Sequence, residues 1–198
     1  MSTKERILQT ALELFNSGNT QMATTNHIAK AMNISPGNLH YHYKNREEII
    51  RVLYKQMRSK ASLPIEELPT TILELNKHLK DLLEILWEYR FFYKELLFLF
   101  SRDSELEKMC VEDNLKHRQR IIKSIENFIK NGELELHNGQ STGYVADYVL
   151  MTEQFYFSYS KTLGKEIDRD SVRETINHIN GVFRPYLTKK AIQNLKLD

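Results

Sequence analysis

The stretch that begins at Thr24 carries helix-boundary signals so closely spaced that only short helices fit between them. Thr24 or its neighbour Thr25 is a suitable N-cap, and Asn33 tolerates the left-handed conformation that ends a helix. Ser35 is again a good N-cap, and Pro36 suits the first helical position because its missing N–H is not needed there. The sequence therefore predicts two short helices joined by a sharp turn.

Two capping boxes place longer helices on either side of this pair. Ser2 with Glu5 opens a first amphipathic helix. Asn45 with Glu48 opens another, so the helix before it must be short and a fourth helix runs from about 46 to 61. The N-terminal region is thus predicted to hold three helices and a connecting fourth.

Apolar residues recur at helical spacing along the rest of the chain, with no hairpin signal and no repeat. The segment 61–68, followed by Pro69, interrupts this pattern and marks a junction. Beyond it, helices are predicted over about 70–89, 90–100, 106–128, 145–159 and 172–187. The expected fold class is all-α, with one domain over residues 1–47 and a larger helical domain over 48–198.

Basic residues concentrate at the N-terminal end of the chain. Residues 1–60 carry nine Lys/Arg against four Asp/Glu, whereas the remaining residues have a small acidic excess. This split indicates a polyanionic partner, although a solvated surface with scattered lysines would look similar. The single cysteine, Cys110, makes no internal disulfide, and no secretory or membrane segment is evident. The expected location is cytoplasmic, with no membrane partner.

The turn and the two short helices describe a helix-turn-helix, whose second helix lies in the DNA major groove. Leu39 and Tyr43 are predicted to face inward, which leaves Asn38 free to hydrogen-bond a base edge. Gly37 would permit close approach, and the basic residues at the start of the fourth helix would contact phosphates. The predicted DNA-binding residues are Thr24, Thr25, Asn26, Ser35, Pro36, Gly37, Asn38, His40, Tyr41, His42, Lys44 and Arg46.

With these residues in register, the sequence resembles the TetR family of bacterial transcriptional regulators. The resemblance rests on "RILQTALELFNSGN" and "TTNHIAKAMNISPGNLHYHYKNREEII" and covers about the first 55 positions. The sequence departs from the family pattern at His40, where tyrosine is usual, at Tyr43, where phenylalanine is usual, and at Asn33, where glycine is common.

The resemblance implies a homodimeric repressor that binds a palindromic double-stranded DNA operator and is released by an unknown small-molecule effector. It assigns ligand binding and dimerisation to the larger domain. The predicted ligand-binding residues are Trp87, Phe91, Phe92, Phe98, Met109, Cys110, His117 and Met151. The predicted dimer-interface residues are Tyr148, Phe155, Tyr156, Tyr159, Ile179, Phe183 and Tyr186. Packing inside the protomer is the alternative for each of them.

No catalytic or metal-binding constellation is evident in the sequence. His40 and His42 are two residues apart on a helix and point in nearly opposite directions, while Asp113 and His117 offer only two ligands. A phosphate loop, a serine elbow and an HExxH motif are all missing. We expect no cofactor, no metal and no enzymatic activity. The alternatives are a helical small-molecule-binding protein or enzyme, and a protein-interaction adaptor, neither of which would bind DNA in a sequence-dependent way.

Overall fold

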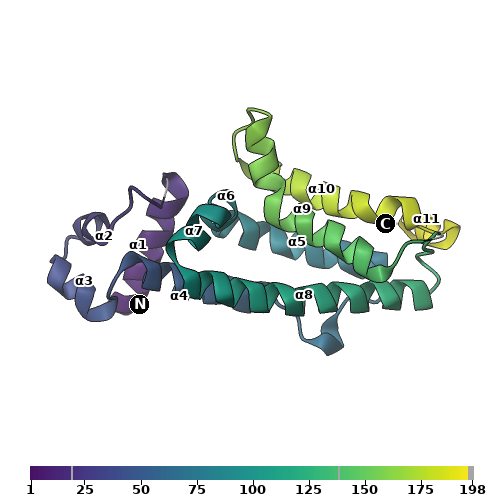
Figure 1. Cartoon of the computed structure of the whole chain (residues 1–198), viewed down its shortest axis with the longest axis horizontal. Helices are drawn as coiled ribbons and strands as arrows, with labels where there is room; N and C mark the ends of the chain where they lie inside the picture. The colour runs from purple at the N-terminus through teal and green to yellow at the C-terminus, as the bar shows by residue number, and fades with distance from the viewer. Residues whose placement is uncertain (19, 138, 196–198) are drawn as a thin grey trace. The chain divides into compact units, whose positions relative to one another are not determined.

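The computed structural model describes residues 1–18, 20–137 and 139–195, and the regular elements within these ranges are helices (Figure 1). The predicted all-α fold is confirmed. The chain divides into two compact units, Met1–Ser62 with Glu88–Met109 and Leu63–Trp87 with Cys110–Asp198. The predicted functional boundary after residue 47 lies inside the first unit and remains a prediction. Within the described ranges, no helix combines the length and apolar character that a bilayer span requires.

The first unit confirms the predicted helix starts. Glu5 N–H donates to Ser2 Oγ at 3.2 Å and Ser2 N–H donates to Glu5 Oε2 at 2.7 Å, which completes the first capping box. At the fourth helix Asn45 caps as predicted, but the Glu48 carboxylate accepts from Lys44 N–H, one residue further out, so the second box is only half formed. The helices of this unit are α1 (Thr3–Ser17), α2 (Thr25–Ala31), α3 (Pro36–His42), α4 (Arg46–Ala61), α6 (Arg90–Lys94), α7 (Leu96–Arg102) and the start of α8 (Ser104–Lys130).

The core of the first unit joins helices that are far apart in sequence. Phe15 of α1 packs against Phe91 of α6 with ring centroids 5.3 Å apart, and Tyr54 of α4 packs against Phe92 at 5.1 Å. All four side chains are buried, and burial of each contributes on the order of 2 kcal/mol. Phe91 and Phe92, which were predicted to bind a ligand, therefore hold α6 against α1 and α4.

The prediction of one helix over 90–100 is wrong, because the helix is interrupted at Glu95, between α6 and α7. Glu95 has φ −123° and ψ 18°, which is outside the helical range. Its carboxylate accepts hydrogen bonds from Thr20 N–H at 3.1 and 3.2 Å and from the Thr20 hydroxyl. Local periodicity could not reveal this break, since the partner is 75 residues away along the chain.

In the second unit the predicted last helix ends at Phe183 rather than at Leu187. Pro185 has no N–H to continue the ladder, so a short 3₁₀ turn follows, and then one further helix that was not predicted. The elements of this unit are η1 (Ile65–Glu67), α5 (Ile72–Glu88), most of α8, α9 (Thr142–Thr162), α10 (Arg169–Phe183), η2 (Arg184–Tyr186) and α11 (Lys189–Leu195). Apolar residues of α5, α8, α9 and α10 close one core, which includes Leu79, Ile125, Phe128, Val145, Val149 and Ile179.

Glu133, in the loop after α8, ties the end of this core together. It is only 4% exposed, and its Oε2 accepts from the N–H of Ile72, the first residue of α5, at 2.6 Å. Its carbonyl accepts from Thr188 N–H at 3.0 Å, and Glu135 N–H donates to the carbonyl of Tyr186 at 2.9 Å. The start of α5 and the chain after α10 are therefore both fixed to the same loop.

Candidate nucleic-acid interface

The turn between α2 and α3 has the geometry that the sequence predicts. Asn33 has φ 58°, the left-handed conformation that asparagine tolerates. Asn33 N–H donates to Lys30 O at 3.1 Å and Ile34 N–H donates to Ala29 O at 3.0 Å, which closes the end of α2. Ser35 then caps α3 by accepting from Asn38 N–H at 3.2 Å. Two seven-residue helices are thus joined by a fully hydrogen-bonded turn.

The helix α3 has one packed side and one open side. Leu39, and Tyr43 just after the end of α3, are buried as predicted, with exposed fractions of 0% and 1%. Asn38 and Tyr41 lie on the open side, and Tyr41 is 86% exposed. The open side also includes Gly37, where an added Cβ would meet only Ser35 Oγ, at 3.9 Å. A helical glycine costs about 1 kcal/mol relative to alanine. Packing within the unit does not require a glycine at position 37. Its lack of a side chain instead lets a partner molecule approach this side of α3 closely.

His40 and His42 present different chemistry although both lie on α3. His40 Nδ1 lies 3.2 Å from the carbonyl of Lys44, so Nδ1 carries the proton and donates to it. The side chain of His40 is exposed, and its Nε2 has no partner among the described residues. The ring of His42 packs edge-on against Tyr41 with centroids 5.2 Å apart. The two predicted contacts therefore have defined orientations before any partner binds.

Two of the predicted DNA contacts are already occupied inside the protein. The backbone N–H of Thr24 donates to His27 Nδ1 at 3.3 Å, in a capping box where histidine replaces the expected glutamate. Arg46 Nη1 donates to the carbonyl of Thr20 at 2.7 Å, and its Nη2 pairs with Glu47 at 2.7 Å. Its side chain is only 16% exposed. Phosphate contacts by Thr24 and Arg46 stay predictions, whereas the exposed Lys44 has no such competing partner among the described residues.

Several side chains that sequence reasoning missed hold the helix-turn-helix against the rest of its unit. Besides the bond from Thr20 to Glu95, Asn16 donates through Nδ2 to Glu88 O at 2.7 Å and accepts from Phe91 N–H at 3.1 Å. These partners are 72 to 75 residues apart along the chain, and no local pattern signals them.

A second link joins α4 to the start of α8. Arg51 Nη1 pairs with Asp103 Oδ2 at 2.7 Å, and the Asp103 side chain is 7% exposed. The other carboxylate oxygen of Asp103 accepts from the N–H groups of Glu105 and Leu106, both at 3.1 Å. One carboxylate therefore caps α8 and anchors α4 at the same time.

The predicted dimer-interface residues fall into two groups. Tyr148, Phe155 and Tyr159 are exposed on α9, between 41% and 54%. The others lie inside the protomer, where they contribute to the core: Tyr156, Ile179, Phe183 and Tyr186. Two exposed residues that were not predicted for the interface, Tyr144 and Met151, complete an apolar row along α9 with the three exposed ones.

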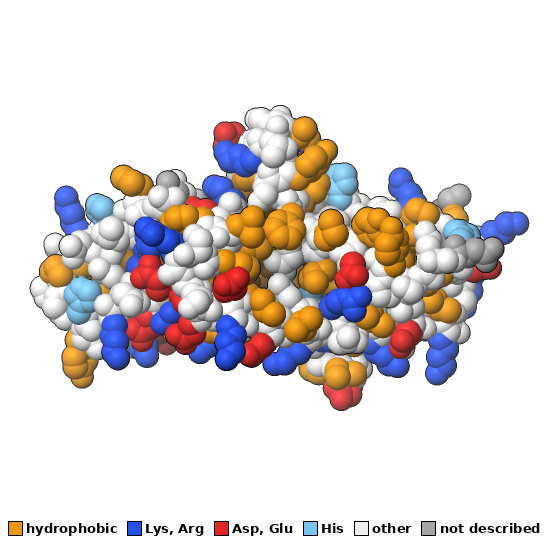
Figure 2. All heavy atoms as spheres, in the orientation of Figure 1, with side chains coloured by type: hydrophobic (Ala, Val, Ile, Leu, Met, Phe, Trp, Pro, Cys, Tyr) orange, Lys and Arg blue, Asp and Glu red, His pale blue; other side chains and the backbone are white. Residues whose placement is uncertain are grey.

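This row, Tyr144, Tyr148, Met151, Phe155 and Tyr159, is here called the α9 stripe. Its members are three or four residues apart and so share one helical face. Hydrophobic side chains gather over α9 in the view of Figure 2. An exposed apolar row of this length typically marks a protein-binding surface.

The predicted ligand-binding residues are divided between the two units. Four of them, Phe91, Phe92, Phe98 and Met109, belong to the first unit, and the other four to the second. Met151 is 59% exposed on the α9 stripe, and the guanidinium of Arg169 covers Trp87 at 5.5 Å from the ring centroid. Cys110 is buried. A shared pocket for these residues remains a prediction.

His117 is part of a polar cluster that links three helices of the second unit. Its Nε2 lies 2.8 Å from Glu153 Oε2, and Asn114 accepts from Gln154 at 3.1 Å, so α8 and α9 are joined twice. His78 of α5 faces this pair, and burial lowers its pKa below the usual 6.5. The carboxylates of Asp81 and Glu153 oppose that shift. Within the described ranges, no group of three or more potential ligands could hold a metal ion.

The comparisons with known proteins agree with this geometry. A family model described as "Bacterial regulatory proteins, tetR family" matches residues 7–53, and one described as "Bacterial transcriptional repressor" matches residues 53–195. Among curated proteins, the uncharacterized HTH-type transcriptional regulator YhgD of Bacillus subtilis (strain 168) is 28% identical over 151 residues, which is 72% of this chain and 77% of the relative.

Solved structures share the fold over nearly the full length. A TetR-family transcriptional regulator from Marinobacter aquaeolei VT8 is 27% identical, with a TM-score of 0.85 over 100% of this chain and 97% of that one. SmeT, described as the repressor of the Stenotrophomonas maltophilia multidrug efflux pump SmeDEF, is 15% identical, with a TM-score of 0.68 over 96% and 93%, a likeness of fold alone.

The packed turn, the open face of α3 and these matches define a DNA-binding transcriptional regulator of the helix-turn-helix class. Since the two family models together cover residues 7–195, the chain belongs to the TetR family of bacterial transcriptional regulators.

Proposed function

We propose that the protein is a homodimeric repressor that binds a palindromic operator and leaves it when a small molecule binds. The observation that carries the proposal is the open face of α3, where hydrogen-bonding side chains are exposed above a buried core. Asn38 is suited to a base edge, and the exposed Lys44 to a phosphate. The remaining predicted contacts would position the helix or line the groove: Thr24, Thr25, Asn26, Ser35, Pro36, Gly37, His40, Tyr41, His42 and Arg46.

The proposed dimer follows from the reach of α3. This helix has seven residues and can read only a few base pairs, so useful specificity requires two half-sites about 34 Å apart. A second copy of the chain supplies the second α3. The α9 stripe supports pairing between copies, because contact between two stripes would remove aromatic side chains from water.

Release of DNA would work through contacts that hold the helix-turn-helix in place. Glu95 fixes Thr20 in the loop before α2, Asn16 fixes the α5–α6 junction, and Asp103 joins α4 to α8. The helix α8 starts in the first unit and continues through the second. An effector that prefers one arrangement of these elements can shift DNA affinity by no more than that preference.

The effector is proposed to be a small organic molecule bound in the second unit. A solved structure that shares the fold is described as a SmeT–triclosan complex. His117 and its neighbours in the polar cluster are candidate contacts. We propose no catalytic activity and a cytoplasmic location, where the chromosome is accessible.

Selection of bound sites from a random DNA pool tests the proposal directly. The expected result is a palindromic consensus bound by a dimer, with affinity that falls steeply as salt rises. A matched pool in which one half of the consensus is scrambled should bind far more weakly. Binding without sequence preference would contradict the regulator, and catalytic turnover without DNA binding would favour the enzyme alternative.

A further inference from the structure

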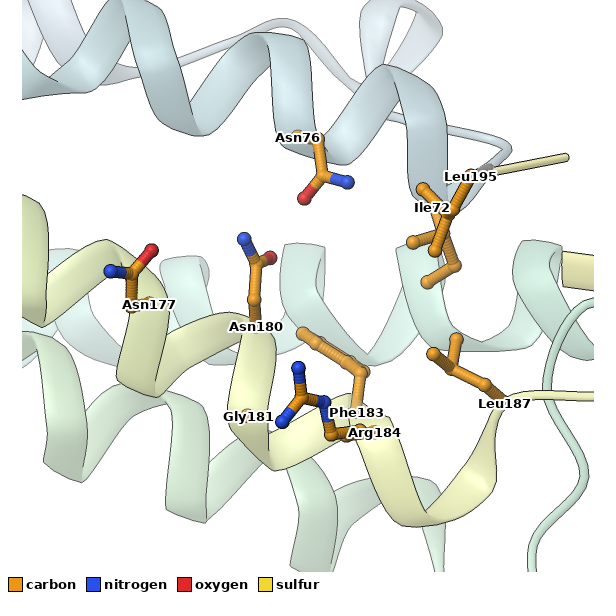
Figure 3. A pocket seen from close by; sticks show the side chains of 9 residues that line it. All are labelled: Ile72, Asn76, Asn177, Asn180, Gly181, Phe183, Arg184, Leu187 and Leu195. Atoms are coloured by element: carbon orange, nitrogen blue, oxygen red, sulfur yellow. The ribbon is translucent and has the colours of Figure 1, made fainter. Parts of the chain in front are cut away.

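A cavity of about 520 Å³ lies between α5 and α10 in the second unit, and none of the predicted ligand-binding residues lines it. Its volume is in the range of small-molecule sites. Its two ends differ in chemistry (Figure 3). Asn76 and Asn180 point toward one another across one end, with Asn177 beside them, whereas Ile72 and Leu187 lie at the other.

The polar end contains hydrogen-bonding groups that the protein leaves unused. Asn76 Oδ1 is buried and receives no hydrogen bond from any described residue. Leaving such an acceptor unpaired costs about 1–3 kcal/mol, so native structures usually supply a partner. Asn177 is exposed and Asn180 is half-buried, and their side-chain amides form no hydrogen bond with another described residue. Three amides from two helices therefore converge on a space where a bound group can use both their donors and their acceptors.

The charge on the cavity wall has one sign. Arg184 is the single charged side chain among the lining residues, and none of the described residues on the wall is acidic. Arg184, the first residue of η2, is exposed, and its guanidinium forms no ion pair with any other described residue. Arg173, on the preceding helix α10, is instead paired with Asp170 at 2.8 Å. A free guanidinium beside amide donors favours a carboxylate, which it can bind through two parallel hydrogen bonds.

The apolar end is held in shape before any ligand arrives. Leu187 is fixed by the antiparallel bridge to Leu134, and Ile72 by the bond from its N–H to Glu133. Leu195 of α11 and Phe183 of α10 complete this end. A preformed apolar wall binds a hydrocarbon segment without paying for its own ordering.

We propose that this cavity binds an amphiphilic hydroxy acid. Its carboxylate would pair with Arg184 and the amides of α10, its hydroxyl would donate to Asn76 Oδ1, and its hydrocarbon chain would lie against Ile72 and Leu187. A simple fatty acid lacks the donor for Asn76, and an alcohol lacks the charge for Arg184. The binding site does not depend on the proposed function. The inference that this molecule acts as the effector does rest on it, and it places the effector in this cavity instead of at the polar cluster of His117.

Calorimetric titration of the full-length protein tests the site. The probes are β-hydroxydecanoate, decanoate and decanol, each below its micelle concentration. β-Hydroxydecanoate should bind about tenfold more tightly than decanoate, because only it satisfies Asn76, and decanol should bind more weakly still. No detectable binding of β-hydroxydecanoate would overturn the proposal, and so would equal affinity for all three probes, which indicates nonspecific uptake by an apolar surface.

Three variants locate the binding. Arg184→Gln should weaken β-hydroxydecanoate at least tenfold but leave decanol unchanged. Arg173→Gln, on the preceding helix α10 and off the cavity wall, is the matched control and should bind like the wild type. Gly181→Leu adds a side chain at the cavity wall, where an added Cβ meets no atom within 4 Å, so the variant should fold and should bind β-hydroxydecanoate at least tenfold more weakly. Unchanged binding by both Arg184→Gln and Gly181→Leu would place the molecule elsewhere and overturn the proposal.

The same titration repeated with operator DNA separates this inference from the proposed function. Release of DNA by β-hydroxydecanoate in the wild type but not in Gly181→Leu supports both. Tight, Arg184-dependent binding that leaves DNA affinity unchanged supports the site and contradicts only its role as effector site. Failure of the ligand-free protein to bind any DNA contradicts the proposed function and leaves the calorimetric result to decide the site.

Discussion

The helices α3 and α9 each bury one side and expose the other, but their exposed sides differ in chemistry. On α3 the open side displays the polar Asn38 and His40 beside one aromatic residue, Tyr41. On α9 it displays the α9 stripe, five large side chains among which the hydroxyls of Tyr144 and Tyr148 bond to each other. A partner of α3 must remain hydrated and polar, as DNA is, whereas a partner of α9 must exclude water.

The layers beneath the two faces also differ. Under α3 the core is apolar, with Leu39 and Ile28 both fully buried. Under α9 an apolar core that includes Val145 and Val149 is joined by the polar cluster of His78, His117 and Glu153. The exposed side chains therefore select the partner of each helix, and only the layer beneath α9 contains groups that titrate near neutral pH.

The α9 face gives the largest expected effect. The double variant Tyr148→Glu/Phe155→Glu places two charges where a partner must exclude water, so the dimer should dissociate. Operator affinity should then fall about 10²- to 10⁴-fold, because the two half-sites are no longer bound as one. Sedimentation and fluorescence anisotropy would measure both quantities.

The matched control is Leu115→Glu, which alters an apolar residue that is 61% exposed on α8 and leaves the α9 stripe intact. It should stay dimeric and bind the operator. If the double variant remains a dimer, the α9 stripe is not the dimer interface, and the proposed difference between the partners of α3 and α9 is wrong.

The next largest effect is expected from the contacts that hold the loop before α2 in place. Glu95→Ala leaves the N–H and hydroxyl of Thr20 without an acceptor, and Thr20 is fully buried. The free energy of unfolding should fall by about 2–3 kcal/mol in chemical denaturation. Glu112→Ala, at an exposed position on α8, should change it by less than about 0.5 kcal/mol. Equal losses in the two variants would show that the Glu95 bonds do not support the loop before α2.

The open face of α3 predicts a split between specific and random DNA. Asn38→Ala should weaken the operator complex about tenfold while changing affinity for random DNA little, since only a base contact is lost. Lys44→Ala should weaken both complexes alike and reduce the salt dependence by about one ion. If the two variants behave identically on both DNAs, the assigned roles are wrong.

The sequence predicts features that depend on neighbours along the chain. Ser35, Pro36 and Asn33 fix a turn through their own backbone preferences, and the burial of Leu39 and Tyr43 follows from helical spacing. The geometry of α3 was therefore predictable from the sequence, whereas the partners of Thr24 and Arg46 within the protein were not.

Features set by distant partners were not predictable. The break at Glu95 depends on Thr20, and no property of the residues around Glu95 marks it. The same holds for α9 and α10, where periodicity identifies an apolar face but cannot divide it between core and surface. Tyr156, Ile179 and Tyr159 were all predicted for the dimer interface, but the first two are buried in the protomer, whereas Tyr159 is exposed.

The polar cluster beneath α9 predicts a pH response that the apolar core beneath α3 lacks. Burial lowers the pKa of His78, with a further lowering from His117 and opposing effects from Asp81 and Glu153. The unfolded chain takes up this proton as the pH falls through about 6.5, while the folded protein resists it. Stability from this source is therefore complete above pH 6.5 and is lost as the pH falls toward the folded pKa.

Replacement of His78 should flatten this dependence. Denaturation of His78→Gln between pH 7 and pH 5 should show a smaller loss of unfolding free energy than the wild type, by at most about 1.4 kcal/mol per pH unit, the limit for one proton. His178→Gln measures the effect of removing an exposed histidine from the same unit. An unchanged slope in His78→Gln would show that the cluster does not sense pH.

The smallest effect is expected in the core beneath α3, where a substitution should stabilise the protein instead of destabilising it. The Tyr43 hydroxyl is buried and bonds to no described residue, and burial, with a smaller contribution from Glu48, raises the pKa of Tyr43 to about 12. Tyr43→Phe removes this unpaired hydroxyl and keeps the ring, over which Lys4 Nζ lies 5.5 Å from the centroid. The free energy of unfolding should rise by up to about 1 kcal/mol, with operator affinity unchanged.

Leu39→Ala, which opens a void at the same depth, should instead destabilise by about 2–5 kcal/mol. A destabilised Tyr43→Phe would mean that the hydroxyl has a partner, and that the core beneath α3 is not purely apolar.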